Sequence, residues 1–252
     1  MQASSRGRVV AVVGMGIVLA LWSLPATASV ITLNPTGDAF VSASNASNNY
    51  GAAGALSVAA SGLAKGEFQS YMKFDTSSAK SSFDSTFGAG QWIIQSVTLQ
   101  LTAASPTNPI FNSPSFAGLF SVTWIPDDSW TEGTGTPSAP GSTGVTFSAQ
   151  PSLAGAADLG TFTYGGTTSG QTTCTLSLPS GFAADVSGGN LVSLHLLAAD
   201  SSVSYVFNSV NNTTVGNRPL LSITAMTPEP ATLALLAVGT LILARGKRDK
   251  RS

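Results

Sequence analysis

The chain has 252 residues, of which 43% are hydrophobic and 9% are charged, and its formal net charge is −1 at neutral pH. Most basic residues lie near the two ends, so residues 29–226 hold four basic and ten acidic side chains, a formal charge of −6. A mildly acidic domain repels phosphate backbones, which argues against nucleic acid as a partner.

The N-terminal segment has the pattern of a secretory signal peptide. Two arginines precede the apolar run 9–24, and Pro25 leads into a triplet of small residues in which Ala26 and Ala28 have the spacing of a cleavage site. A permanent signal anchor is the alternative, but Pro25 breaks a helix directly before the triplet. The sequence therefore predicts a signal peptide at residues 1–28, removed by signal peptidase, and an exported protein.

Residues 29–226 alternate between apolar and polar side chains in short segments separated by Gly, Pro and Asn. In Phe68–Asp75, for example, Phe68, Met72 and Phe74 share one face, while Tyr71 and Lys73 share the other. This period of two is typical of antiparallel sheets with one solvated face. The predicted strands are Val30–Leu33, Ala39–Ala43, Leu56–Ala60, Phe68–Asp75, Val97–Ala103, Ala117–Trp124, Val145–Ser148, Leu159–Tyr164, Thr172–Leu178, Val192–Ala198, Val203–Phe207 and Leu221–Ala225.

These strands predict an all-β fold, an antiparallel β-sandwich of the jelly-roll type, with no long helix inside it. The Pro-, Ser-, Thr- and Gly-rich stretches Ser105–Ser115 and Trp130–Thr143 are predicted to be loops. We expect two further helices to flank the sandwich, a signal helix at the N-terminus and a short hydrophobic helix at the C-terminus.

Two reactive side chains occur once each. Cys174 is the single cysteine, so no intrachain disulfide can form, and its position in phase with Leu176 and Leu178 predicts a buried apolar role. His195 is the single histidine, which excludes a zinc site built from several histidines. It lies on the opposite face of its strand from Leu194 and Leu196, and no nucleophile motif accompanies it. We therefore expect a surface or half-buried structural residue rather than a catalytic base.

Three acids surround Trp130 and supply the main chemical alternatives. Asp127, Asp128 and Glu132 could serve as paired carboxylates of a glycoside hydrolase, and an indole beside an acid could hold a sugar. The other interpretation is a turn at Asp127–Ser129 with Trp130 closing the sandwich edge. We favour a structural role, expect no catalytic residue, and retain Trp130 and Asp128 as candidate glycan contacts.

The C-terminal segment, residues 227–252, combines Pro228-Glu229-Pro230 with an apolar stretch and a basic tail. The apolar stretch, residues 231–244, would be about 21 Å long as a helix, which is short for a bilayer core of roughly 30 Å. This order resembles the PEP-CTERM sorting signal of Gram-negative-type bacteria. The resemblance implies processing by an exosortase-type membrane protease, transient or permanent membrane attachment through the helix, and a place in an extracellular or biofilm matrix. A plain single-span tail anchor is the alternative.

Several short motifs resemble the DNRLRE-type (disaggregatase-related) jelly-roll domain over residues 38–223. They are Asp38-Ala-Phe-Val41, Asn48-Asn-Tyr-Gly51, Leu56-Ser-Val58, Ser70-Tyr-Met-Lys-Phe-Asp75, Ile94-Gln-Ser-Val-Thr-Leu-Gln-Leu101, Asp128-Ser-Trp-Thr-Glu132 and Arg218-Pro-Leu-Leu221. The segment between Thr76 and Gly90 is longer than in that family. The resemblance implies a fold like that of carbohydrate-binding modules, and by analogy a structural calcium ion at Asp38 and Asp185.

Three functions follow as expectations. The first is a cell-surface or extracellular-matrix structural protein, which is not an enzyme and needs no cofactor. The second is a module that binds extracellular polysaccharide through aromatic platforms, for which the candidates are Trp92, Trp124, Trp130, Tyr50 and Tyr71. The third is a secreted polysaccharide-degrading enzyme that would use Asp128 and Glu132.

Overall fold

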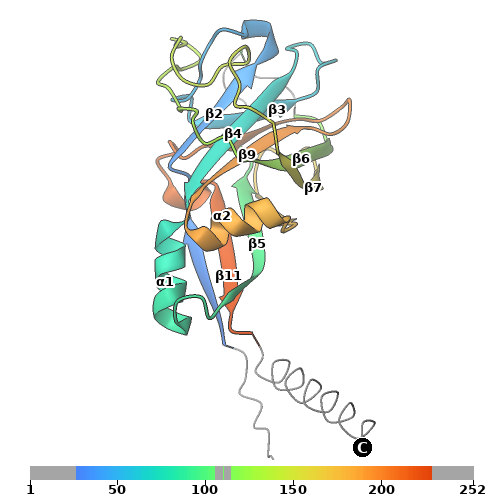
Figure 1. Cartoon of the computed structure of the whole chain (residues 1–252). Coiled ribbons are helices and arrows are strands. Elements are labelled where there is room, and N and C mark those ends of the chain that lie inside the picture. Colours follow the sequence, from blue (N-terminus) through green and yellow to red (C-terminus); the bar gives the residue numbers. More distant parts are fainter. Residues whose placement is uncertain (1–26, 106–109, 111–114, 229–252) are drawn as a thin grey trace, which may run out of the picture. The chain divides into compact units, whose positions relative to one another are not determined.

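A computed structural model describes residues 27–105, 110 and 115–228, which belong to one compact unit. Two antiparallel sheets pack into a sandwich (Figure 1), as predicted. The smaller sheet has the order β1 (Ala28–Leu33), β11 (Leu220–Met226), β5 (Ile93–Thr102) and β8 (Gln171–Leu176). The larger sheet has the order β10 (Ser204–Asn208), β3 (Ala55–Ala59), β4 (Phe68–Asp75), β9 (Leu191–Ala198), β6 (Gly118–Ile125) and β7 (Ala157–Tyr164), and β2 (Gly37–Ser42) also pairs with β4.

The core between the sheets is built from rows of side chains that cross neighbouring strands. Leu221 of β11 pairs with Leu99 of β5, which pairs with Cys174 of β8, and all three side chains are buried. Burying one such aliphatic side chain stabilises the fold by about 1.5–3 kcal/mol. The alternation in β5 therefore directs one face of the smaller sheet into the core, and the predicted burial of Cys174 is confirmed.

The larger sheet differs from the prediction because its outer face is partly buried as well. The connection between β6 and β7, residues 126–156, covers the outer face of β2, β4 and β9. Tyr71, expected on a solvated face, is instead buried with Trp130 in a second apolar cluster, whose members are Ala39, Val41, Tyr71, Ile125, Trp130 and Val145. Alternation along β4 identified its two faces but could not reveal this covering loop.

Two short helices complete the described unit and were missed by the sequence analysis. Helix α1 (Ser77–Phe87) occupies the long segment after β4 and buries Ala79 and Phe83, which lie four residues apart. Helix α2 (Ser180–Gly188) likewise buries Phe182 and Val186. Figure 1 shows both helices beside the strands of the sandwich. The i, i+4 spacing of these apolar residues was the available signal.

One predicted strand is wrong. Val145–Ser148 forms no strand; Thr146 and Ala149 make an isolated bridge instead. The flanking helices predicted at the two ends lie outside the described residues.

Candidate functional site

An open depression lies at one end of the larger sheet, between the β3–β4 connection and the β9–β10 turn. Its volume is about 480 Å³. The backbone joins its two sides, because the amide of Ala60 donates to the carbonyl oxygen of Val203 at 3.0 Å. The lining residues combine small side chains with two carboxylates; they are Ala60, Ser61, Gly62, Glu67, Ala198, Ala199, Asp200 and Ser201.

Asp200 shapes the depression by fixing the β9–β10 turn. Its Oδ1 accepts hydrogen bonds from the amides of Ser202 (2.9 Å) and Val203 (2.8 Å), and its Oδ2 accepts one from the amide of Leu119. Loss of contact with water raises the pKa of Asp200, but these amide donors outweigh it and hold the pKa below its ordinary value. Asp200 therefore stays ionised at neutral pH and ties the turn to the start of β6.

Glu67 is oriented by a chain of polar contacts that reaches under the covering loop. The side-chain nitrogen of Gln69 donates to Glu67 Oε1 at 2.5 Å. The side-chain oxygen of Gln69 therefore points away from Glu67 and lies 2.8 Å from His195 Nε2. Because an amide oxygen only accepts, His195 Nε2 carries the proton. Gln150, from the covering loop, donates to the same Gln69 oxygen at 3.3 Å. This series of hydrogen bonds therefore fixes the position of one carboxylate oxygen of Glu67.

An exposed aromatic side chain lies next to the β9–β10 turn. Phe116 is the one exposed aromatic residue in the part of the chain that the structure describes, with 41% of its surface accessible. Its backbone exchanges two hydrogen bonds with Ser204, at 2.8 and 3.1 Å, and the Ser202 hydroxyl donates to the carbonyl oxygen of Ala117. Leu119, whose amide bonds Asp200, is 39% exposed. An apolar rim thus adjoins Asp200 and the β9–β10 turn.

The structure buries the predicted glycan contact Trp130 and leaves the other, Asp128, partly buried beside it. Trp130 is 7% exposed, and its indole N–H donates to the Ser193 hydroxyl at 2.9 Å, which in turn donates to Asp128 Oδ1 at 2.5 Å. Lys73 Nζ lies 4.5 Å from the Trp130 ring centroid and donates to the carbonyl oxygens of Asp128 and Trp130. Burial raises the pKa of Asp128. The indole has no free face for a sugar.

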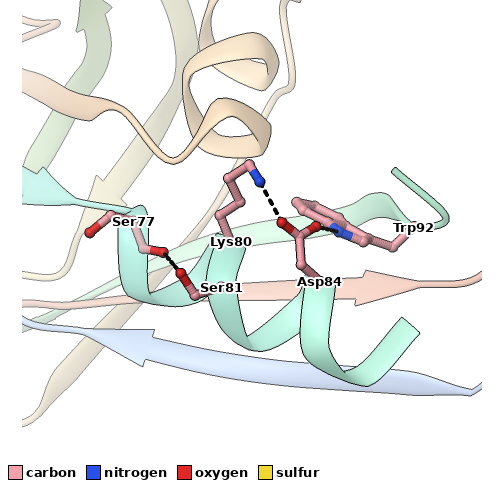
Figure 2. A network of polar contacts seen from close by, with 5 residues as sticks. All are labelled: Ser77, Lys80, Ser81, Asp84 and Trp92. Carbon is pink, nitrogen blue, oxygen red and sulfur yellow. Dashed lines mark hydrogen bonds and ion pairs between the residues drawn. The ribbon is translucent and has the colours of Figure 1, made fainter. Parts of the chain in front are cut away.

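The remaining predicted platforms are also occupied by protein contacts. Trp92 packs against helix α1, where its indole N–H donates to Asp84 Oδ1 at 2.8 Å (Figure 2). The centroid of its ring lies 5.0 Å from that of Phe83. Lys80 forms an ion pair with the other oxygen of Asp84. The other three platform candidates, Trp124, Tyr50 and Tyr71, are buried. The predicted aromatic residues therefore serve the fold.

His195 is more deeply placed than predicted. It is 3% exposed, where a surface or half-buried position was expected, because the covering loop lies over this part of β9. Burial lowers the pKa of its imidazole to about 4. Burial likewise raises the pKa of the Cys174 thiol to about 12. Both groups are therefore neutral at physiological pH.

The predicted acid pairs are not brought together. Asp128 bonds Ser193, whereas Glu132 bonds the side-chain amide of Asn211 at 2.9 Å. Asp185 accepts a hydrogen bond from the indole N–H of Trp124 at 3.1 Å. Among the described residues, no three His, Cys, Asp or Glu side chains gather as a metal-binding group.

The residues predicted for processing lie mostly outside the described range. Ala26, Glu229 and Pro230 are outside it, whereas Ala28 opens β1 opposite Met226 and Pro228 follows β11. In the described part of the chain, no helix has the length and apolar character needed to cross a membrane.

Sequence reasoning missed Glu67, Asp200 and Phe116. Nothing in their local sequence distinguishes them. The depression forms between two loops about 135 residues apart in the sequence, and the exposure of an aromatic ring is decided by the whole fold. Their short-range context, a turn acid and an aromatic residue before a strand, is shared by many structural positions.

One protein family matches the chain by its family model. The model of carbohydrate-binding module family 96 matches residues 29–225, a range that contains both sheets and the depression. No curated protein matches the chain.

Proposed function

The chain belongs to carbohydrate-binding module family 96, and from this membership we propose that its sandwich binds an extracellular polysaccharide. The observation that carries the proposal, beside the family, is the open depression with two carboxylates and an exposed aromatic rim. Sites for small ligands are concave and combine apolar surface with a few placed polar groups. The depression and its rim have this composition.

In the proposed complex, the glycan lies over the β9–β10 turn. Glu67 accepts hydrogen bonds from sugar hydroxyls, because Gln69 occupies one of its oxygens and fixes its direction. Phe116 packs its ring on the apolar face of a sugar ring, and Ser61 and Ser201 supply hydroxyls that donate or accept. Asp200 supports the turn, since its oxygens are engaged by backbone amides.

A binding role also fits the contacts of the acids considered for catalysis. Hydrolysis of a glycosidic bond generally uses two carboxyl groups that flank the bond. Asp128 and Glu132 instead bond different partners, Ser193 and Asn211. We therefore assign these acids to the fold and the module to binding.

We further propose that the module acts outside the cytoplasm, in the cell envelope or a polysaccharide matrix. Support comes from the signal-peptide pattern ending at Ala28 and from the order of Pro228-Glu229-Pro230, apolar stretch and basic tail. In this proposal signal peptidase and an exosortase-type protease process the chain. Intact-mass analysis of the native protein tests it: loss of both ends is expected, and a native chain that keeps residues 1–28 would contradict export by cleavage.

The binding proposal is tested with the full chain by affinity electrophoresis in gels that contain neutral, amino-sugar and uronate-rich polysaccharides. Retardation in at least one polysaccharide, abolished by an excess of its oligosaccharides, is expected. Unchanged migration in every gel would contradict glycan binding.

A further inference from the structure

The depression beside the β9–β10 turn is lined by two carboxylates that come from opposite sides. Glu67 belongs to the β3–β4 connection and Asp200 to the β9–β10 turn. Backbone amides keep the pKa of Asp200 below its ordinary value, so this group is ionised at neutral pH. The other lining residues are small and carry no charge. A ligand that enters the depression therefore meets a negatively charged surface.

The two carboxylates offer different interactions to a ligand. Both oxygens of Asp200 accept hydrogen bonds from backbone amides, so this residue contributes mainly its charge. Glu67 Oε1 accepts from the side chain of Gln69, which fixes the orientation of the carboxylate. Within residues 27–105, 110 and 115–228, no group donates to Glu67 Oε2. This oxygen is therefore available to a donor on the ligand.

No basic side chain among the described residues lines the depression. Three of the four basic side chains of residues 29–226 form bonds elsewhere: Lys73 with carbonyl oxygens beneath the covering loop, Lys80 with an acid of α1, and Arg218 with a carbonyl oxygen of the β10–β11 connection. The fourth, Lys65, lies in the β3–β4 connection but is not one of the lining residues. A concave site of one sign attracts ligands of the opposite charge, here cations.

We infer that the polysaccharide bound at this site carries free amino groups, as glucosamine units do, an inference that rests on the proposed glycan site. A protonated amine has three hydrogen-bond donors and no acceptor, so it can donate to Glu67 Oε2 while Asp200 attracts its charge. Such a charge-assisted bond is about twice as strong as a bond between neutral groups. A uronate would be repelled by both acids, and a neutral sugar would gain one ordinary hydrogen bond.

The test compares two oligosaccharides by calorimetric titration of the full chain. One is a glucosamine hexamer, and the other is the same hexamer with every amine acetylated, which removes the charge and leaves the sugar backbone unchanged. The free-amine hexamer is expected to bind at least about tenfold more tightly. This preference should shrink between about 0.05 and 0.5 M NaCl, because salt screens the attraction between exposed charges.

The outcomes separate this inference from the proposed function. Equal affinity for the two hexamers, or no binding of the glucosamine hexamer, would overturn the inference. Retardation of the chain in gels of neutral or uronate-rich polysaccharide would in that case leave glycan binding in place. Unchanged migration in every gel would remove both.

Variants show which carboxylate recognises the amine. Glu67→Gln keeps the size of the side chain and removes its charge, so the preference for the free-amine hexamer should fall at least about fivefold. Asp158→Asn removes an exposed acid of β7 that does not line the depression, and the new amide oxygen can still accept from the amide of Gly160. This matched control should keep the preference of the natural chain. An unchanged preference in Glu67→Gln would overturn the inference.

Discussion

The imidazole ring of His195 lies parallel to the phenol ring of Tyr71, with 4.5 Å between the ring centroids and 2° between the ring planes. Both rings are buried beneath the covering loop, and His195 Nε2 donates to Gln69, the residue that orients Glu67. The single histidine therefore does not line the candidate site. It supports the site indirectly, by holding Gln69, which orients Glu67.

The stability of the fold is expected to fall as His195 becomes protonated. Its pKa is about 4 in the folded protein, against an ordinary value of 6.5 that applies to the unfolded chain, so between these values the unfolded chain binds more protons. The stabilisation is present above pH 6.5 and is lost as the pH falls towards 4, by at most about 1.4 kcal/mol per pH unit. Urea unfolding at several pH values, with His195→Phe as the comparison, isolates this effect. An equal pH dependence in both proteins would contradict the assignment.

The Asn49 side chain bonds four backbone groups and is expected to be essential for the covering loop. Its Nδ2 donates to the carbonyl oxygens of Glu132 and Val145, and its Oδ1 accepts from the amides of Gly51 and Gly135. Asn49→Ala leaves these groups buried without partners and should lower the free energy of unfolding by about 3 kcal/mol or more.

The neighbouring substitution Asn48→Ala is the control for Asn49→Ala. Asn48 makes one weak side-chain bond, to the hydroxyl of Tyr50 at 3.3 Å, so we expect a loss below about 1 kcal/mol. Chemical denaturation measures both. Similar losses in the two variants would show that Asn49 is not a special support of the loop.

Trp130 provides a test that separates a structural role from a sugar contact. Trp130→Phe removes the bond to Ser193 and weakens the contact with Lys73, so the free energy of unfolding should fall by about 2 kcal/mol. Glycan affinity of the folded variant should stay unchanged. A tenfold loss of glycan affinity with an unchanged free energy of unfolding would show instead that Trp130 contacts the glycan.

Cys174 is expected to resist alkylation in the folded protein. Its thiol is buried in the core, and burial raises its pKa to about 12, so little thiolate exists at a pH of about 8. Mass spectrometry after iodoacetamide treatment should find Cys174 unmodified in buffer and modified in urea. Rapid labelling in the native protein would contradict the packing of β8.

The sequence predicts the sandwich well because apolar and polar side chains alternate along β5 and β9, and this alternation identifies the two faces of each strand. It could not predict that residues 126–156 fold back over the larger sheet, and this covering decides which side chains remain exposed. Trp130 and Tyr71 therefore resemble binding platforms in the sequence and are buried in the fold. Conversely, Phe116 is a candidate glycan contact because no part of the described fold covers its side chain.

The central claim is that the depression beside the β9–β10 turn is the glycan site. Calorimetric titration of the full chain with oligosaccharides of the polysaccharide that retards it should give at least about a tenfold loss of affinity for Phe116→Ala and for Glu67→Gln. Leu153→Ala, which removes another exposed apolar side chain, should bind like the natural chain. Wild-type affinity in both Phe116→Ala and Glu67→Gln would contradict the account.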